Sequence, residues 1–245
     1  MGKTLTQLFN ICNASRSYQE VGENVNYMFQ EDGDTLYIYF QPSRGKVDWR
    51  HNFAFWKKPY KGMKIPYRVH GGFLECWKYV DDIVIEKVTE KDAADGFRWK
   101  RIVITGYSHG GALAMLCHEC VWYHRPDLRK GKLLTFAFEA PRVYAGFWMW
   151  GKLKERWEGF TIFRNQHDIV THVPPVLFGF RHVGELRKMG AKPDMKGAFK
   201  KMFKCLFKRD WKGLKDAAGV FFGVRAHYPA EVLKGLAKIE DGREY

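Results

Sequence analysis

A short serine motif flanked by glycines constrains the fold of this chain more than any other feature. Residues 106–110 read Gly-Tyr-Ser-His-Gly, which places Ser108 in the pattern G-x-S-x-G. The compact β-branched run 99–105 predicts a buried strand directly before the motif, and residues 110–124 predict a helix directly after it. A strand and a helix that pass so close together need small residues two positions before and after the serine. The sequence therefore predicts that Ser108 is a nucleophile at a sharp strand-to-helix turn.

The other hydrophobic runs alternate between strand and helix patterns. We expect further strands over 25–29, 35–40, 133–138 and 160–164, and helices over 4–19, 73–88, 148–157 and 230–239. This alternation favours an α/β fold with a mostly parallel sheet. A length of 245 residues is enough for one domain with a substantial core, so we expect a single domain over residues 1–245.

Four further blocks of sequence surround the serine motif GYSHGGALA. They are FQPSRGKVDWRHNF at 40–53, VHGGF at 69–73, TFAFEAPRV at 135–143 and FRNQHDIVTHVPP at 163–175. In these blocks and in their order the chain resembles a class 3 lipase, the fungal-lipase-like branch of the α/β-hydrolases. The resemblance implies an α/β-hydrolase fold, with a central mostly parallel sheet flanked by helices. It also implies a triacylglycerol lipase-like serine ester hydrolase, a lipase or esterase that forms an acyl-enzyme on ester or lipid substrates without a metal or cofactor.

A nucleophilic serine needs a base, and the base needs an acid that orients it. In α/β-hydrolases these follow the serine in the order acid, then histidine. Asp168 comes just after the predicted strand 160–164, at the end where open α/β sheets place functional groups. It also stands at the position of the family's aspartate. The competing acid, Asp127, follows Pro126 at the expected end of a helix, and we interpret it as a surface residue.

Several histidines follow Ser108 with an acid between, and we predict that His227 is the base. It precedes the expected C-terminal helix, as the histidine of the family does. His182 is the main alternative, because residues 180–184 resemble the family's strand after the aspartate loop. His172 lies only four residues from Asp168, in the same loop. The predicted triad is therefore Ser108, Asp168 and His227.

Two backbone N–H groups should stabilise the oxyanion that forms when a serine attacks an ester. The first is expected from His109, the residue after the nucleophile. The second is expected from Ser43, because Phe40-Gln41-Pro42-Ser43 matches the Phe-Arg-Gly-Thr/Ser that class 3 lipases usually carry. Pro42 replaces a glycine and has no N–H, which leaves the conformation of this loop open. A competing donor loop is His70-Gly71-Gly72, which is similar to the HGGG motif of other esterases.

The formal net charge of +14 is concentrated in one segment. Arg187–Lys215 contains 11 basic and two acidic side chains, so nine of the 14 net charges lie there. Apolar residues at 195, 198, 199, 202, 203 and 206 have helical spacing. We therefore expect a basic amphipathic helical insertion or cap over residues 187–220, before His227. The helix could lie on an anionic membrane surface, or pack its apolar face on the core with its lysines in water. A lid could be this segment or residues 57–69.

Other signals bear on compartment and partners. No run of 18 apolar residues appears, which argues against a membrane-spanning helix, and residues 1–17 lack the apolar region of a secretory signal. Cytoplasmic is therefore the default location, with release or peripheral membrane association left open. MGKTLT fits the loose myristoylation pattern. No nucleic-acid module is recognised, so no nucleic-acid partner is expected. The sequence gives no indication of oligomeric state.

The five cysteines are scattered and odd in number, which argues against a disulfide framework and fits a reducing compartment. Cys117 and Cys120 form a C-x-x-C pair with His118 and His124 nearby. Because no second ligand pair with zinc spacing exists, we interpret them as small residues on a helix.

Two other functions remain compatible with the sequence. One is a catalytically weak or inactive hydrolase-fold protein that binds anionic membranes through Arg187–Lys215, for which Pro42 is the best support. The other is a different serine hydrolase on the same fold, such as a thioesterase or a peptidase, because a fold does not fix a substrate.

Removal of the charges of Lys200, Lys201 and Lys204 tests the membrane hypothesis. If the basic segment binds an anionic surface, a variant with all three lysines neutralised should bind anionic liposomes more weakly than the unmodified chain. Co-sedimentation with liposomes measures this difference. Unchanged binding would assign the segment to packing on the hydrolase core.

Overall fold

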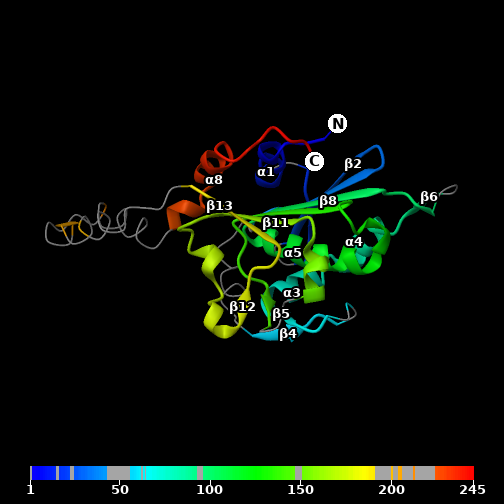
Figure 1. The fold of residues 1–245 in the computed structure, drawn as a ribbon, viewed down its shortest axis with the longest axis horizontal. Coiled ribbons are helices and arrows are strands. Elements are labelled where there is room, and N and C mark those ends of the chain that lie inside the picture. The colour runs from blue at the N-terminus through cyan, green and yellow to red at the C-terminus, as the bar shows by residue number, and fades with distance from the viewer. Residues whose placement is uncertain are drawn as a thin grey trace.

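The computed structural model describes residues 2–245 except 15–16, 23–24, 43–55, 62, 64, 93–95, 147–150, 191–199, 201–203, 206–211 and 213–223. Its centre is a seven-stranded sheet in the order β1-β2-β3-β8-β9-β11-β13 (Figure 1). The strands are β1 (Gln19–Val21), β2 (Val25–Asp32), β3 (Thr35–Phe40), β8 (Arg101–Tyr107), β9 (Leu133–Phe138), β11 (Phe160–Asn165) and β13 (Glu185–Met189). β1, β2 and β3 pair antiparallel, and every pairing from β3 to β13 is parallel. The α/β fold with a mostly parallel sheet is thus confirmed.

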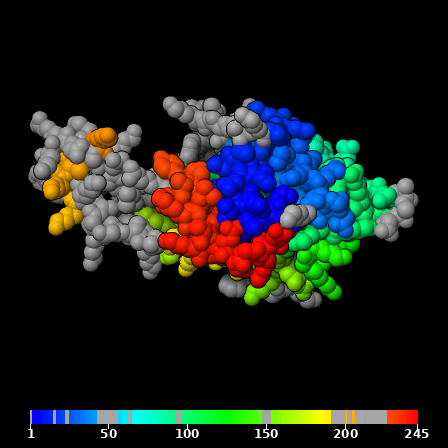
Figure 2. Space-filling model, turned by 90° about the horizontal axis from the view of Figure 1, so that it is seen from above, coloured from blue at the N-terminus to red at the C-terminus, as the bar shows by residue number. Residues whose placement is uncertain are grey.

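Helices cover both faces of this sheet. α1 (Leu5–Asn13) and α8 (Pro229–Leu236) lie on one face, and α3 (Gly71–Trp77), α4 (Asp81–Val88) and α5 (His109–His124) lie on the other (Figure 1). Figure 2 shows the first pair, in blue and red, next to each other on their face. Short 3-10 turns connect several elements: Pro126–Leu128, Gly151–Trp157, Val170–His172, Val176–Phe178 and Val224–His227. In the described part of the chain, no helix is both long and apolar enough to cross a membrane.

Smaller sheets lie beside the central one. β12 (Phe180–Arg181), β10 (Tyr144–Ala145), β5 (Arg68–His70) and β4 (Lys57–Pro59) form an antiparallel sheet in that order. β6 (Lys91–Asp92) and β7 (Gly96–Phe97) form a separate hairpin. The segment 57–69, one of the two candidate lids, therefore contributes a strand at each of its ends.

Side chains of the central strands alternate between two hydrophobic layers. In β3, Tyr37 and Tyr39 point to the layer that contains α1 and α8, whereas Ile38 and Phe40 point to the layer that contains α5. In α1 the buried residues Leu5, Leu8, Phe9 and Cys12 follow helical spacing, which makes one face of the helix apolar. Thr4 and Gln7 exchange hydrogen bonds in a capping box that fixes the start of this helix. The Phe9 ring makes edge contacts with Tyr107 of β8 and Phe138 of β9, each at 5.2 Å between centroids.

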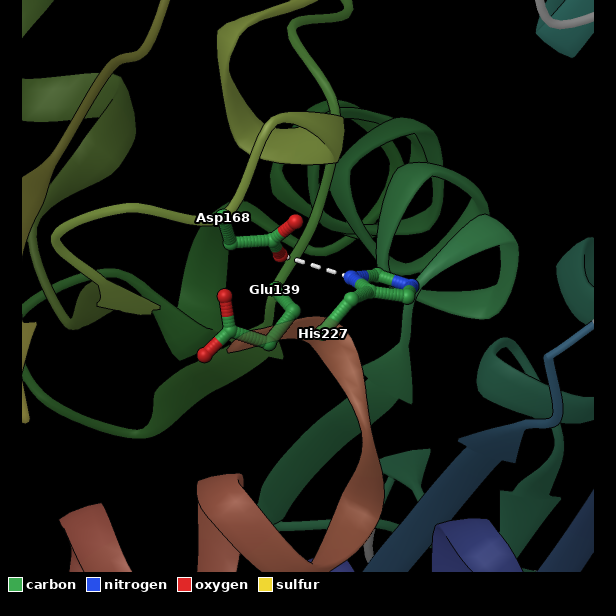
Figure 3. Close-up of side chains that lie close together, drawn as sticks. All are labelled: Glu139, Asp168 and His227. Atoms are coloured by element: carbon green, nitrogen blue, oxygen red, sulfur yellow. Dashed lines mark hydrogen bonds and ion pairs between the residues drawn. The ribbon is translucent and has the colours of Figure 1, made fainter. Parts of the chain in front are cut away.

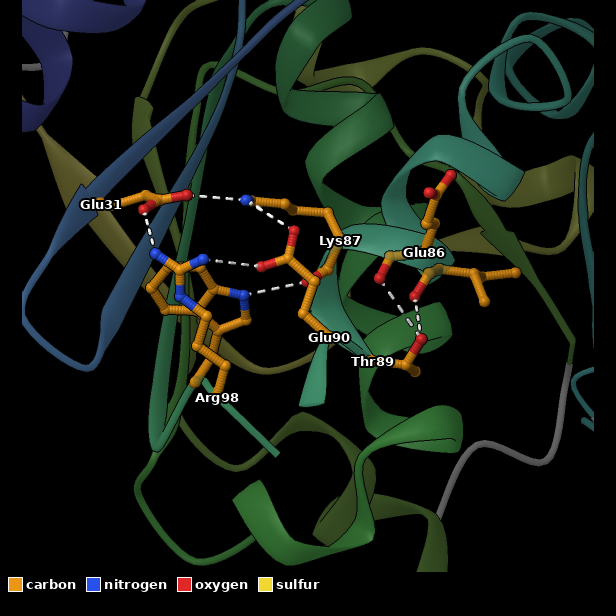
Figure 4. Close-up of polar contacts among 8 residues, drawn as sticks. Glu31, Glu86, Lys87, Thr89, Glu90 and Arg98 are labelled. Carbon is orange, nitrogen blue, oxygen red and sulfur yellow. Dashed lines mark hydrogen bonds and ion pairs between the residues drawn. The ribbon is translucent and has the colours of Figure 1, made fainter. Parts of the chain in front are cut away.

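A cluster of ion pairs joins β2 to the last turn of α4 and to the connection between α4 and β8 (Figure 4). Glu31 binds Lys87 at 2.7 Å and Arg98 at 2.6 Å, and Glu90 binds Lys87 at 2.8 Å. Both cations also lie over the ring of the buried Trp99. The side chain of Glu31 is 40% exposed, so water and salt screen these pairs and each contributes little to stability.

Several expected elements differ from the observed ones. The expected helix 4–19 ends at Asn13, and Gln19–Val21 is a strand instead. The expected helix 73–88 is two helices, since Asp81 and Asp82 begin a new one where acidic side chains favour a helix N-terminus. The helix expected over 148–157 is a 3-10 turn over Gly151–Trp157, and 148–150 lie outside the described residues.

The first residues of the expected basic insertion lie in a strand. Arg187 and Lys188 belong to β13, which pairs parallel with β11, so the proposed helical boundary at residue 187 is wrong. Beyond Gly190, the structure describes only residues 200, 204, 205 and 212 before residue 224. The apolar positions of the predicted amphipathic helix, 195, 198, 199, 202, 203 and 206, therefore all lie outside the described residues.

All five cysteines are buried, and each is a thiol rather than half of a disulfide. Cys117 and Cys120 lie within α5, and both belong to the apolar layer on that side of the sheet. His118 between them hydrogen-bonds the Thr135 hydroxyl and the Arg156 carbonyl oxygen, which are structural contacts.

Truncation of Phe9 should destabilise the fold far more than loss of the ion-pair cluster. Phe9→Ala removes a fully buried ring, and we expect it to lower the free energy of unfolding by about 3–5 kcal/mol. Glu31→Gln should lower it by about 1 kcal/mol or less, because the pairs are partly exposed. Urea denaturation of both variants gives the two values. Similar losses would contradict the assignment of stability to the α1 layer.

Candidate active site

Ser108 occupies the turn between β8 and α5, as the sequence predicts. Its backbone has φ 57° and ψ −119°, a region that a side chain other than glycine rarely adopts. The Ser108 N–H donates to the Phe138 carbonyl oxygen at 2.9 Å, which ties the strained turn to the end of β9. Such strain persists only where neighbouring structure holds it, and it is frequent at functional sites.

The glycines around Ser108 are required by the approach of α5 to the sheet. A Cβ atom at Gly106 would overlap the carbonyl group of Gly110. A Cβ atom at Gly110 would overlap the carbonyl oxygens of Phe40 and Gln41, at the end of β3. The nucleophile turn and the start of the loop after β3 are thus in direct backbone contact.

Three predicted residues lie together at the carboxyl end of the sheet. The Oγ of Ser108 is 2.7 Å from the Nε2 of His227, and the Nδ1 of His227 is 2.6 Å from the Oδ2 of Asp168. Asp168 is fully buried, whereas the His227 side chain is 16% exposed. In this arrangement the Nε2 can accept the serine proton while the aspartate accepts the hydrogen on Nδ1. The three side chains thus form a continuous hydrogen-bonded series from Ser108 through His227 to Asp168.

Local contacts hold the acid and the base in place. Asp168 follows β11, its N–H donates to the Asn165 carbonyl oxygen, and its Oδ1 accepts from the Val170 N–H at 2.9 Å. His227 ends a 3-10 turn just before α8. The Tyr107 hydroxyl donates to the His227 carbonyl oxygen, and the two rings stack at 5.4 Å. β8, which ends directly before Ser108, therefore also holds His227 in place.

Glu139 is a fourth residue of this cluster, and it was not predicted from the sequence (Figure 3). It follows β9, is fully buried and has φ 48°. Its Oε1 accepts from the Asn165 N–H at 2.8 Å. Burial and the adjacent Asp168 carboxylate raise the pKa of Glu139 well above its usual range. The signal was present, since Glu139 directly follows a predicted strand, as Asp168 does.

Glu139, Asp168 and His227 also form a group that could offer ligands to a metal. One carboxylate oxygen from each acid and one ring nitrogen of His227 lie within 4.8 Å of one another. The Oδ2 of Asp168 and the Nδ1 of His227 are already joined by a 2.6 Å hydrogen bond. That distance matches a proton between the two atoms, and a metal ion would have to part them.

The alternative bases make other contacts. His182 directs Nε2 to the Thr171 carbonyl oxygen at 2.8 Å, and burial lowers its pKa to about 3. His172 directs Nδ1 to the backbone oxygen of Asp168 rather than to the carboxylate. The alternative acid, Asp127, pairs with Arg125 at the end of α5. The geometry therefore favours His227 and Asp168 over these alternatives.

Of the two expected oxyanion donors, the structure describes only His109. His109 is the first residue of α5, and helix N-termini are places where backbone N–H groups can bind an anion. Ser43 lies outside the described residues. The competing loop His70-Gly71-Gly72 leads into α3: the Gly71 N–H donates to the Trp56 carbonyl oxygen, and the His70 side chain caps the helix. His70-Gly71-Gly72 therefore forms the start of α3.

Comparison with known proteins identifies relatives in sequence. The model of the family Lipase (class 3) matches residues 37–178. Lipase from Rhizomucor miehei is 30% identical over 155 residues, which are 62% of this chain and 40% of that protein. Lipase from Rhizopus niveus is 33% identical over 165 residues, or 64% and 40%. The chain thus spans about 40% of the length of these curated relatives.

Solved structures show the same fold. A triacylglycerol lipase, described as having a serine protease triad as its catalytic centre, aligns with a TM-score of 0.58 at 24% identity. The alignment covers 71% of this chain and 67% of that one. Lipase II from Rhizopus niveus aligns with a TM-score of 0.56 at 26% identity, over 68% and 62% of the two chains.

Gly110→Ala should disrupt the site because its Cβ would overlap two backbone oxygens, a clash that no side-chain rotation can relieve. We expect it to separate α5 from the loop after β3 and to lower the free energy of unfolding by several kcal/mol, at the upper end for single substitutions. Gly33→Ala is the matched control, since its φ is 60° and no atom lies within 4 Å of the added Cβ. The control should cost only about 1–2 kcal/mol. Thermal and urea unfolding of both variants make the comparison, and equal losses would contradict it.

Proposed function

The chain belongs to the class 3 lipase family, and on that premise we propose that it is a serine ester hydrolase acting through Ser108, His227 and Asp168. The observation that carries the proposal is the unbroken series of hydrogen bonds from the Ser108 Oγ through His227 to Asp168. The strained backbone of Ser108 at the start of α5 supports it independently, since this geometry places a side chain where a substrate can meet it.

The proposed reaction proceeds in two halves. The Ser108 Oγ attacks the ester carbonyl carbon while its proton passes to the His227 Nε2, and the Asp168 carboxylate stabilises the imidazolium. The N–H groups of His109 and Ser43 bind the oxyanion of the tetrahedral intermediate. His227 then gives the proton to the departing alcohol, which leaves an ester on Ser108. Water attacks that ester by the same route, releases the acid and restores the serine.

Apolar side chains near the triad favour lipid esters as substrates. Ile169 and Tyr228, which directly follow Asp168 and His227, are 44% and 55% exposed. The turn Val176–Phe178 exposes three large apolar side chains, and Leu177 is 88% exposed. Exposed apolar side chains are typical of surfaces that receive apolar ligands. The names of relatives, such as the secreted mono- and diacylglycerol lipase 1 of Fusarium solani, suggest acylglycerols for this chain as well.

We also propose one catalytic domain over residues 1–245, with its basic insertion after β13 rather than from residue 187. Within Arg187–Lys215, the charges after Gly190 would attract an anionic lipid surface and so concentrate the enzyme near its substrate. Arg187 itself pairs with Glu185 within β13, and it contributes less to that attraction.

Ser108→Ala and His227→Ala should each lower ester turnover by about 10⁴-fold or more, because each removes a group without which proton transfer and attack fail. The measurement is hydrolysis of p-nitrophenyl esters with short and long acyl chains by the unmodified chain and each variant. The chain-length profile separates an esterase from a lipase. His182→Ala is the matched control, since His182 contacts the Thr171 carbonyl oxygen and should leave turnover nearly unchanged.

Full ester turnover by Ser108→Ala would refute Ser108 as the nucleophile. If His182→Ala lost turnover while His227→Ala kept it, the base would be His182 rather than His227. If the unmodified chain hydrolyses no ester but binds anionic vesicles in a salt-sensitive way that Ser108→Ala leaves unchanged, the weak or inactive membrane-binding alternative is favoured instead.

A further inference from the structure

Two buried carboxyl groups lie next to each other behind the proposed base, although a Ser-His-Asp mechanism uses only one. Glu139 and Asp168 are both fully buried, and one oxygen of each lies within 4.8 Å of the other and of a His227 ring nitrogen (Figure 3). Two carboxylates this close in an apolar interior cannot both remain ionised, because each charge opposes the other and neither is hydrated. One of the pair must hold a proton.

Hydrogen bonds decide which acid holds that proton. Asp168 accepts from two donors, the Val170 N–H at Oδ1 and the His227 ring at Oδ2. Glu139 accepts from one donor, the Asn165 N–H at Oε1, and its Oε2 has no other hydrogen-bond partner among the residues that the structure describes. More donors stabilise the negative charge better, so the charge remains on Asp168 and the proton on Glu139.

The position of the Glu139 proton leaves it one suitable acceptor. With Oε1 occupied by Asn165, it lies on Oε2, and the neighbouring Asp168 carboxylate still has lone pairs free after its two hydrogen bonds. A hydrogen bond from a neutral acid to a carboxylate is charge-assisted and stronger than a neutral pair. We propose that Glu139 is a neutral acid that donates a hydrogen bond to Asp168, and thus a positioning residue that aims Asp168 at His227.

The surroundings of Glu139 fit this role. Its other contact, Asn165, uses its side chain to donate to the Ala226 carbonyl oxygen, one residue before His227. The charged or titratable groups that face Glu139 are Asp168 and His227, together with Tyr107 from β8 and Arg164 from β11. Burial and the charge of Asp168 raise the pKa of Glu139, and they outweigh the opposing effects of the Asn165 N–H and Arg164. Glu139 therefore links the ends of β9 and β11 to both loops that carry the acid and the base.

Stability against pH tests the proton without any need for turnover. Glu139→Gln imitates the neutral acid, since its amide can accept from Asn165 and donate to Asp168. An unfolded glutamate ionises at a pKa of about 4.3, while folded Glu139 keeps its proton, so the native chain loses stability as pH rises through the interval between the two pKa values. Because Gln does not titrate, the ratio of folding constants, Glu139→Gln over native, should rise about tenfold per pH unit there.

A ratio of folding constants that stays constant between pH 4 and pH 8 would overturn the neutral acid. This comparison stands even if no ester is hydrolysed, so it is separate from the proposed function, on which the positioning role itself rests.

Kinetics test the positioning role. With a soluble p-nitrophenyl ester, Glu139→Gln should keep kcat and the pH profile of kcat/KM close to those of the native chain. Glu139→Met has similar length but no donor, and we expect it to lose about 10–100-fold in kcat. Without the donor Asp168 attracts the His227 proton more strongly, so the acidic limb of the profile should move to higher pH.

Three results would overturn the proposal. Glu139→Met could match the native chain in both kcat and pH profile. Alternatively, Glu139→Gln could move the acidic limb to lower pH, the direction expected if it removed a negative charge. Finally, EDTA could abolish the activity of the native chain and a divalent cation could restore it, while Glu139→Gln responds to neither. That result would assign the three ligand atoms to a metal.

Discussion

The close approach of α5 to the ends of β3 and β8 is the constraint on which the rest of this structure depends. It exists because Gly106 and Gly110 have no Cβ atoms, so backbone meets backbone with no side chain between. The approach forces Ser108 into its unusual φ and places it at the carboxyl edge of the sheet. Because β8, β9 and β11 are parallel neighbours, the residues that follow each of them, including Glu139 and Asp168, reach the same edge.

The sequence predicts most of this core because parallel strands are buried on both faces and read as continuous apolar runs. The bounds of β9 are as expected, and β11 extends the expected strand by one residue. β13 was missed because its sequence, ELRKM, belongs to a strand at the edge of the sheet and is largely charged. Periodicity alone cannot separate such a strand from the basic segment that follows it.

One rule is enough to select the clustered residues Asp168 and His227 from the sequence, but no single rule applies where two groups have to be weighed together. The rule that functional groups follow strands selects Asp168, and the order of residues selects His227. The same rule applied to β9 would have selected Glu139, but a sequence does not show that two carboxyl groups share one buried volume. Their protonation depends on how many N–H groups each accepts from, and those donors, such as the Asn165 N–H, come from the fold.

The stacked ring of Tyr107 has a consequence for the first helix of the chain. Tyr107 contacts His227 on one side, and the Phe9 ring of α1 lies against Tyr107 at 5.2 Å. The N-terminal helix thus supports His227 indirectly, through the ring of Tyr107. Phe9 and His227 are more than two hundred residues apart along the chain. Substitutions in α1 would change the orientation of the His227 imidazole. Variation in α1 can therefore alter the reactivity of the site while the surface that faces the substrate stays the same.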